Sequence, residues 1–314
     1  MIKMILKRIL QIIPMLFIIS IISFFLLQLA PGDPIRLYVT PNMKPEDIER
    51  VRTSLGLDQP IYVQYIKWLT ELLQGNLGYS IRSNQPVLGL ILERIPATIG
   101  LMGISLLLTL AIAIPLGLLS SILENSYIDK IFNVFAYIGL SIPSFWLGII
   151  LIDFFSVRFQ LLPSTGMRTI GMDTFADLIK HSILPIITLT LQSCAIYYRY
   201  VRSNAIAELK EPYIEFEYSK GLSKFEIVQK HVLKNVLLPV ITLLGMSLPS
   251  LITGAFITER IFSWPGMGSF GIDAIYNLDY PIIMAITLFS GALLIIGNLL
   301  ADITYQLVDP RIRK

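Results

Sequence analysis

The sequence predicts an all-α membrane protein with six transmembrane helices. Three observations lead to this fold class: 54% of the 314 residues are hydrophobic, only 15% are charged, and the mean hydropathy is +0.69. A soluble domain carries roughly 25% charged residues, so the composition excludes an ordinary soluble globule. The net charge of +3 is too small to indicate a nucleic-acid partner.

Six apolar segments approach the length of about 20 residues that a helix needs to cross a bilayer. They cover residues 9–30, 97–123, 131–157, 182–198, 236–258 and 281–301. The first segment follows three basic residues, as a signal peptide would. Its apolar stretch is longer than the usual stretch of about 7–15 residues, so we expect it to be retained as a span.

Basic residues predict the orientation of these spans. With the N-terminus in the cytoplasm, fourteen Lys and Arg residues lie on the inner side and four lie in the short outer segments. Because cytoplasmic loops collect basic residues, we expect a multi-pass protein of the cell (inner, or cytoplasmic) membrane. Both termini should lie in the cytoplasm.

Residues 31–95 are predicted to form an external helical segment with two short amphipathic helices. Pro45 and Pro60 suit first helical turns, while Gly56 and Gly75 suit helix ends. Two interpretations stay open for this segment: a structural cap packed on the membrane helices, or a docking surface for an external partner. One face of the second helix is apolar and consists of Ile61, Tyr65, Trp68, Leu69 and Leu72.

Residues 203–235 are predicted to form a large cytoplasmic loop that contains a short helix. Pro212 should begin this helix, Gly221 should end it, and Ser223 with Glu226 should cap the next one. A helix of two turns is unstable alone in water, so it must pack on something. A partner's groove and an ordinary connector on the membrane face both suit its mixed surface of Tyr213, Glu215, Phe216, Glu217, Tyr218 and Lys220.

The predicted spans lack an ionisable residue at their middle, which argues against a proton-coupled carrier or a voltage sensor. They do contain residues that bend helices. Helix packing and bending around a pathway both explain such residues. The set consists of Pro115, Gly117, Pro143, Pro239, Gly245, Pro249 and Gly254.

Several motif matches carry no chemistry. The segment from Gly266 to Gly271 fits G-x-G-x-x-G, but it lacks the strand and βαβ setting of a dinucleotide site. No phosphate-binding loop occurs, so any ATP must be bound by another chain. His181 and His231 form no local metal-ligand pair, and Cys194 lies in an apolar run, as a small buried hydrophobic residue does.

Two function classes compete with a transporter subunit. An intramembrane enzyme would need a base near Ser144 or Ser193, and no His or Asp lies at a suitable depth in the sequence. A channel or secondary carrier that works without partners is the other alternative. Co-purification would separate these classes, because an importer subunit should be isolated with a second permease and ATPases.

Short motifs along almost the whole chain resemble the ABC-importer permeases of the dipeptide/oligopeptide/nickel family. Each motif is weak alone, but their order over about 300 residues is specific. One departure concerns the loop signature, because Glu-Ala-Ala of the generic signature is replaced here by Glu215-Phe-Glu217. The motifs are Leu29-Ala-Pro-Gly-Asp-Pro34, Leu55 to Tyr65, Gly75-Asn-Leu-Gly78, Ser141-Ile-Pro-Ser-Phe-Trp146, Tyr213 to Pro239, Phe262 to Gly268, Asp279-Tyr-Pro281 and Asp309-Pro-Arg-Ile-Arg313.

The resemblance implies a type I ABC importer permease fold with an external helical insertion after the first helix. It divides the chain into an N-terminal transmembrane helix (1–30), an external segment (31–95), a core permease domain with five transmembrane helices (96–306) and a cytoplasmic tail (307–314). The loop 203–235 would couple the core domain to an ATPase. The implied contact residues are Tyr213, Glu215, Phe216, Glu217, Lys220 and Gly221.

The resemblance also implies partners and a cargo. The partners are a second homologous permease, two ABC ATPase subunits that bind ATP and Mg, an extracellular solute-binding protein and membrane lipid. This chain itself would hold no cofactor, metal or catalytic residue. We expect dipeptides or oligopeptides as cargo, with nickel or a metal–chelator complex as the alternative. The expected pathway residues are Pro143, Ser144, Ser247, Pro249 and Thr253.

Overall fold

The computed structural model describes residues 2–29, 35, 43–54 and 56–308. All regular elements within these residues are helical, which confirms the all-α class. The predicted motif at residues 30–34 and most of the predicted tail 307–314 lie outside the described residues. The elements are α1 Ile2–Gln28, α2 Pro45–Ser54, α3 Ile61–Leu73, α4 Val87–Ile122, α5 Tyr127–Ser141, α6 Ser144–Leu151, η2 Ile152–Arg158, α7 Phe175–Glu208, α8 Pro212–Ser219, α9 Lys224–Ile227, η3 Val228–Val232, α10 Leu233–Ser247, α11 Ser250–Thr253, α12 Phe256–Ile261, α13 Met267–Tyr276 and α14 Tyr280–Val308.

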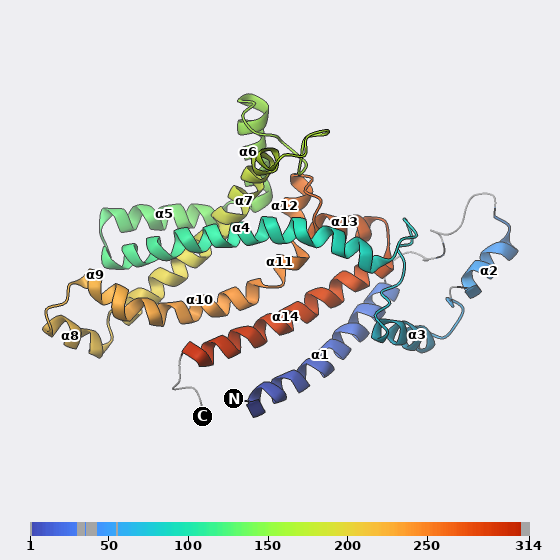
Figure 1. Cartoon of the computed structure of the whole chain (residues 1–314), viewed down its shortest axis with the longest axis horizontal. Helices are drawn as coiled ribbons and strands as arrows, with labels where there is room; N and C mark the ends of the chain where they lie inside the picture. Colours follow the sequence, from blue (N-terminus) through green and yellow to red (C-terminus); the bar gives the residue numbers. More distant parts are fainter. Residues whose placement is uncertain (1, 30–34, 36–42, 55, 309–314) are drawn as a thin grey trace.

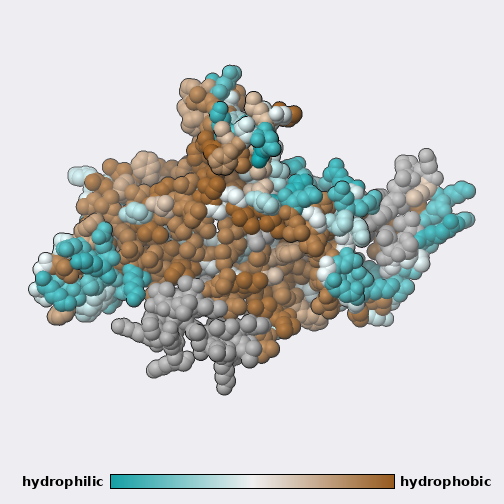
Figure 2. Space-filling view, viewed as in Figure 1, coloured by the Kyte–Doolittle hydropathy of each residue, from teal (hydrophilic) through white to brown (hydrophobic). Residues whose placement is uncertain are grey.

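Four helices of the described chain are long and apolar enough to cross a membrane, and the bent pair formed by α5 and α6–η2 would make a fifth span. The apolar part of α1, Ile12–Gln28, is shorter. An apolar belt covers the middle of the molecule, with hydrophilic surface at the α8–α9 end and at the α2–α3 end (Figure 2). A helical bundle that spans a bilayer has this pattern, because its middle faces lipid and its two ends face water.

The core of the bundle is built around α4 and α7, which lie side by side (Figure 1). A Cβ added to Gly117 of α4 would lie 2.7 Å from Cγ1 of Val201 on α7, so only glycine permits this approach. The largest apolar cluster includes Ala113 and Val201, and it continues without a break to Ile214 of α8 and Val232 of η3. The spans and the loop beyond them therefore share one core.

The expected third span is not one straight helix. α5 and the α6–η2 segment meet at an angle of 98°, and α6 projects away from the bundle (Figure 1). Pro143 lies at the bend as the N-cap of α6, where its missing N–H removes a helical hydrogen bond. The continuous span 131–157 expected from hydropathy is thus replaced by two helices.

The expected fifth span ends before residue 258. α10 and α11 together reach Thr253, and Gly254 then adopts a φ of +80°, which ends the helix. α12 and α13 follow as short helices joined by the buried carboxylate of Glu259. This carboxylate accepts hydrogen bonds from the Thr98 hydroxyl at 3.2 Å and from the Ser269 backbone N–H at 3.0 Å.

α3 packs against α1 outside the core bundle. The hydroxyl groups of Tyr65 and Ser20 lie 2.8 Å apart, and the ring centroids of Tyr65 and Phe24 are 5.3 Å apart in an edge-on arrangement. The two predicted amphipathic helices are confirmed as α2 and α3. Of the predicted apolar face of α3, Ile61 is exposed while Tyr65 is buried. The packing of α3 on α1 is compatible with both interpretations of this segment.

Candidate functional site: the α8 loop and its connection to the spans

The short helix predicted in the loop 203–235 is present as α8. Pro212 occupies its first turn, and Gly221 follows it with a φ of +83°, in the left-handed region that glycine adopts most readily. Ser223 and Glu226 form the predicted capping box at the start of α9, with the Ser223 N–H donating to Glu226 at 2.9 Å. Local rules therefore account for both ends of α8.

One face of α8 is buried in the protein. Ile214 is fully buried in the apolar cluster that also contains Ile227. Glu217, on the same helix, accepts a hydrogen bond from Nζ of Lys220 at 2.9 Å and has Nε2 of His231 at 3.6 Å. The hydrogen bond from Lys220 holds the pKa of Glu217 below its ordinary value. α8 is thereby fixed in orientation before any partner binds.

The rest of the α8 surface presents aromatic rings to solvent. Phe216 is 63% exposed, and Tyr218 and Tyr213 are also exposed. Nζ of Lys220 lies 4.2 Å from the centroid of the Phe216 ring. Exposed aromatic rings on a rigid, small helix provide an anchor for a groove, since such residues dominate the energy of protein interfaces.

The beginning of α8 is tied to both flanking spans. The Tyr213 hydroxyl donates to Oε1 of Glu208 at 2.7 Å, and the Asn235 amide donates to the same oxygen at 2.6 Å. Burial, followed by the hydrogen bond to Glu208, raises the pKa of Tyr213 above its usual range. Tyr213 therefore stays protonated and remains a donor to the end of α7.

The far side of the loop contacts the turn between α4 and α5. Nζ of Lys224, the first residue of α9, donates to the carbonyl oxygen of Ile122 at 2.7 Å. Ile122 is the last residue of α4. The loop is therefore in contact with α4 as well as with α7 and α10.

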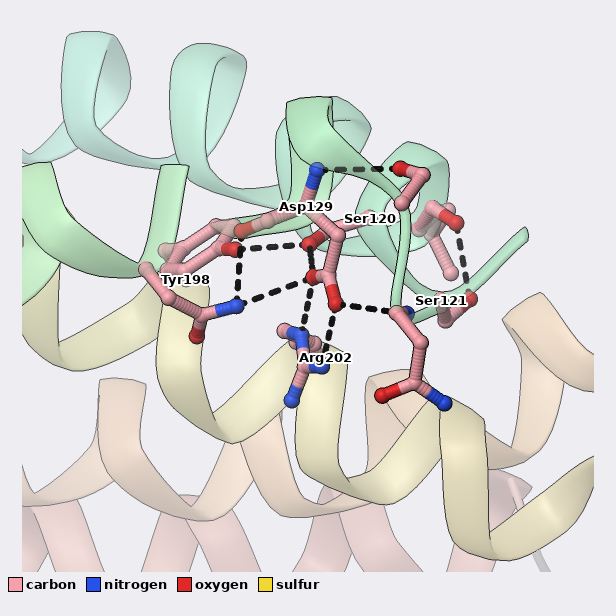
Figure 3. Close-up of polar contacts among 9 residues, drawn as sticks. Ser120, Ser121, Asp129, Tyr198 and Arg202 are labelled. Atoms are coloured by element: carbon pink, nitrogen blue, oxygen red, sulfur yellow. Dashed lines mark hydrogen bonds and ion pairs between the residues drawn. The ribbon is translucent and has the colours of Figure 1, made fainter. Parts of the chain in front are cut away.

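A buried polar network joins α4, α5 and α7 close to this loop (Figure 3). Nε and Nη2 of Arg202 donate to the two carboxylate oxygens of Asp129 at 2.6 and 2.7 Å. The Ser120 hydroxyl also donates to Asp129 and lies 2.7 Å from the Tyr198 hydroxyl. Arg202 and Tyr198 come from α7, Asp129 from α5 and Ser120 from α4. The network therefore links three helices to one another.

Sequence reasoning missed this network. Its signal was present, because Asp129 and Arg202 are opposite charges at the expected inner ends of two spans. The pairing joins residues 73 positions apart, however, and hydropathy carries no information about which spans are neighbours.

The expected coupling residues lie together in α8 and the turn after it, whereas the expected pathway residues are divided between two places. Two lie at the α5–α6 bend, and three lie at the end of α10 and in α11. The Ser247 hydroxyl lies 3.1 Å from the Tyr197 hydroxyl, and the Thr253 hydroxyl donates to the carbonyl of Pro249 at 3.0 Å. The divided set is Pro143, Ser144, Ser247, Pro249 and Thr253.

The described residues offer little to a metal. Within the ranges described above, no group of three His, Cys, Asp or Glu side chains has metal-binding proximity. The G-x-G-x-x-G match belongs to the loop before α13 and to α13 itself, where a short helix and not a strand precedes it.

Comparisons with known proteins assign the chain to a family. Residues 113–314 match the family "Binding-protein-dependent transport system inner membrane component", and residues 1–102 match the N-terminal part of the same kind of component. The oligopeptide transport system permease protein AppB of Bacillus subtilis (strain 168) is 43% identical over 98% of each chain. The glutathione transport system permease protein GsiC of Escherichia coli O6:H1 is 36% identical over 100% of this chain and 99% of that protein.

A solved structure supports the same fold. A chain of the inward-facing MetNI methionine ABC transporter matches with a TM-score of 0.54 over 71% of this chain and 97% of the solved chain, at 19% identity. The chain thus has the ABC importer permease fold, and it is a non-catalytic, multi-pass subunit of the inner membrane that works with an ATPase and a binding protein. It belongs to the family of binding-protein-dependent transport system inner membrane components.

Proposed function

We propose that this chain is a channel-forming subunit of an ATP-driven importer for dipeptides or oligopeptides. The observation that carries the cargo class is the end-to-end match to relatives whose names specify peptide cargo. These are the oligopeptide permease of Bacillus subtilis and, at 36% identity over 94% of this chain, the probable D,D-dipeptide permease protein DdpB of Escherichia coli (strain K12). The alternative cargo is nickel or a metal–chelator complex, and an uptake experiment in proteoliposomes distinguishes it from peptide.

The α8 loop is the proposed contact with a cytoplasmic ATPase. The exposed Phe216 ring enters a cleft of the ATPase, while the buried Ile214 keeps α8 fixed to the permease. Closure of the ATPases around ATP then moves α8, and the hydrogen bonds to Glu208 and Ile122 carry this movement into the spans. The proposed coupling residues are Tyr213, Glu215, Phe216, Glu217, Lys220 and Gly221.

The proposed assembly contains six spans in this chain, a second homologous permease, two ATPases with bound ATP and Mg, and an external binding protein. Both termini lie in the cytoplasm. Two features support this arrangement: α1 begins and α14 ends towards the α8 side of the molecule (Figure 1), and α5 leaves a broad apolar face uncovered for a second permease or lipid. This face includes Ile128, Ile131, Val134, Phe135 and Ile138.

The proposed pathway passes the two breaks in the spans. Broken helices are tolerated at membrane depth where they line a cavity or are covered by protein. The α5–α6 bend and the α10–α11 break therefore suit a route for polar cargo, with Pro143, Ser144, Ser247, Pro249 and Thr253 as its proposed lining.

Uptake by the complete transporter in proteoliposomes tests the proposal. With the binding protein outside and ATP inside, labelled di- and oligopeptides should accumulate, and an ATPase variant unable to hydrolyse ATP should abolish accumulation. A nickel–chelator complex should not accumulate under the same conditions. Accumulation of the nickel complex and not of peptide would show that the cargo is the metal complex. Peptide uptake that needs no ATPase would refute the importer mechanism.

A further inference from the structure

A polar cavity opens between α5 and α7 on the α8 side of the bundle. Its volume is about 560 Å³, within the range of roughly 300–1,000 Å³ that is usual for small-molecule sites. Arg199, at its wall, lies nine residues before the end of α7, which is roughly 13 Å along the helix. The lining consists of Asn133, Tyr137, Leu140, Ile196, Arg199, Tyr200, Arg202, Ser203 and Asn204.

The cavity carries an uncompensated positive charge. None of its nine lining residues is acidic, and Arg199 forms no ion pair with any carboxylate in the described part of the chain. Its guanidinium lies instead 5.0 Å from the centroid of the Tyr137 ring. The other cation, Arg202, is already engaged by both oxygens of Asp129, so Arg199 is the cation that remains available to a ligand.

The two sides of α5 differ in chemistry. On the side towards α4, a second cavity of about 350 Å³ is lined almost wholly by apolar groups, among them Leu108 and Ile112 of α4 and Phe135 of α5. On the side of the polar cavity, amide, hydroxyl and guanidinium groups make up about half of the lining, beside Leu140 and Ile196. Polar and charged groups of a span face water or protein and not hydrocarbon. The polar side of α5 is therefore the side that faces an aqueous route.

We propose that this cavity binds the C-terminal carboxylate of the transported peptide as it leaves the route on the α8 side. The proposal rests on the proposed function. An Arg guanidinium offers paired donors that match the two oxygens of a carboxylate. Tyr137 stacking holds the guanidinium in place, and the hydroxyls of Tyr200 and Ser203, which form no hydrogen bond with other described side chains, are positioned at the same cavity to donate to the bound anion.

The test compares peptides that differ only at the C-terminus. Uptake of a tripeptide with a free carboxylate and of its C-terminal amide is measured in proteoliposomes for wild type and for Arg199→Gln. Because the same binding protein serves both variants, its own preference divides out of the comparison. The ratio of acid to amide uptake should fall about three- to tenfold in Arg199→Gln, since hydrogen bonds to charged groups contribute more than neutral ones.

Two further variants make the result specific. Arg199→Lys keeps the charge and should retain most of the acid preference. Lys130→Gln removes an exposed cation of α5 that does not line the cavity, and its acid-to-amide ratio should equal that of wild type. Arg199→Lys also guards against misfolding, because recovery of the ratio shows that the charge and not the fold was lost.

Three results would overturn the assignment. An equal loss of acid and amide uptake in Arg199→Gln would indicate a structural role for Arg199. An unchanged ratio, together with loss of co-purified phosphatidylglycerol measured by native mass spectrometry, would assign the cavity to a lipid phosphate. Failure of wild type to transport either peptide would instead reject the proposed function itself, and the cargo site with it.

Discussion

Arg202 of α7 donates two parallel hydrogen bonds to the carboxylate of Asp129 on α5, at 2.6 and 2.7 Å. The Asp129 side chain is only 3% exposed and that of Arg202 is 22% exposed. The pair joins α7 to α5, the helix that ends at the Pro143 bend.

Removing one member of this pair should destabilise the protein strongly. Arg202→Gln leaves a buried carboxylate without its cation and should lower the free energy of unfolding by about 3 kcal/mol. Unfolding of the purified permease complex would measure this loss, and a cycle with Asp129→Asn should show that the double variant loses less than the sum of both single variants.

The exposed pair of Arg158 and Asp153 serves as the control for the buried pair. Its side chains are 67% and 50% exposed, so Arg158→Gln should change stability by no more than about 1 kcal/mol. Equal effects of Arg158→Gln and Arg202→Gln would contradict the structural role of the Asp129–Arg202 pair.

Two substitutions on opposite faces of α8 should have separable effects. Phe216→Ala removes an exposed ring and should leave the permease stable while reducing co-purification with the ATPase and uptake. Ile214→Ala removes a fully buried side chain and should lower stability by about 2–5 kcal/mol. Thermal unfolding of the permease and the amount of bound ATPase distinguish the two results, and a stable, fully coupled Phe216→Ala variant would argue against the docking proposal.

The pH dependence of the α8 loop should depend on Glu217. The hydrogen bond from Lys220 lowers the pKa of Glu217 from 4.5 in the unfolded chain, so its contribution to stability is fully present above pH 4.5 and is lost as the pH falls through the lower folded value. The hydrogen-exchange protection factors of residues 213–220, which correct for the intrinsic pH dependence of exchange, should fall in that acidic range. Glu217→Gln should remove this part of the pH dependence, and an unchanged profile would exclude Glu217 as its source.

Alanine should be tolerated very differently at two glycines with similar backbone angles. Gly254 (φ +80°) has the carboxylate of Glu259 and the backbone of Gly268 within 3 Å of an added Cβ, whereas Gly75 (φ +83°) has open space. Gly75→Ala should cost only the roughly 1–2 kcal/mol of a left-handed alanine, and Gly254→Ala should cost clearly more. Comparable melting temperatures for the two variants would show that the α11–α12 break adjusts without strain.

Local features of the loop were predictable from neighbouring residues. Pro212, Gly221 and the pair Ser223–Glu226 act over one to three positions, where backbone sterics and capping hydrogen bonds decide the outcome. The bend at Pro143 was marked by the proline, but its angle of 98° was not predictable. A proline removes one hydrogen bond, and the direction of the next helix then depends on what it packs against.

The sequence by itself determined that the chain is helical, that apolar segments dominate it and that a short capped helix stands in the loop before α10. Those properties follow from hydropathy and from interactions between near neighbours along the chain. Only the tertiary structure decided that Asp129 meets Arg202, that Lys224 meets the end of α4 and that Arg199 faces a cavity without an acidic partner. Contacts between distant residues depend on which helices pack together. The hydrophobic effect is non-directional and does not distinguish one apolar span from another. The pairing of spans is therefore set by side-chain packing and by buried polar groups.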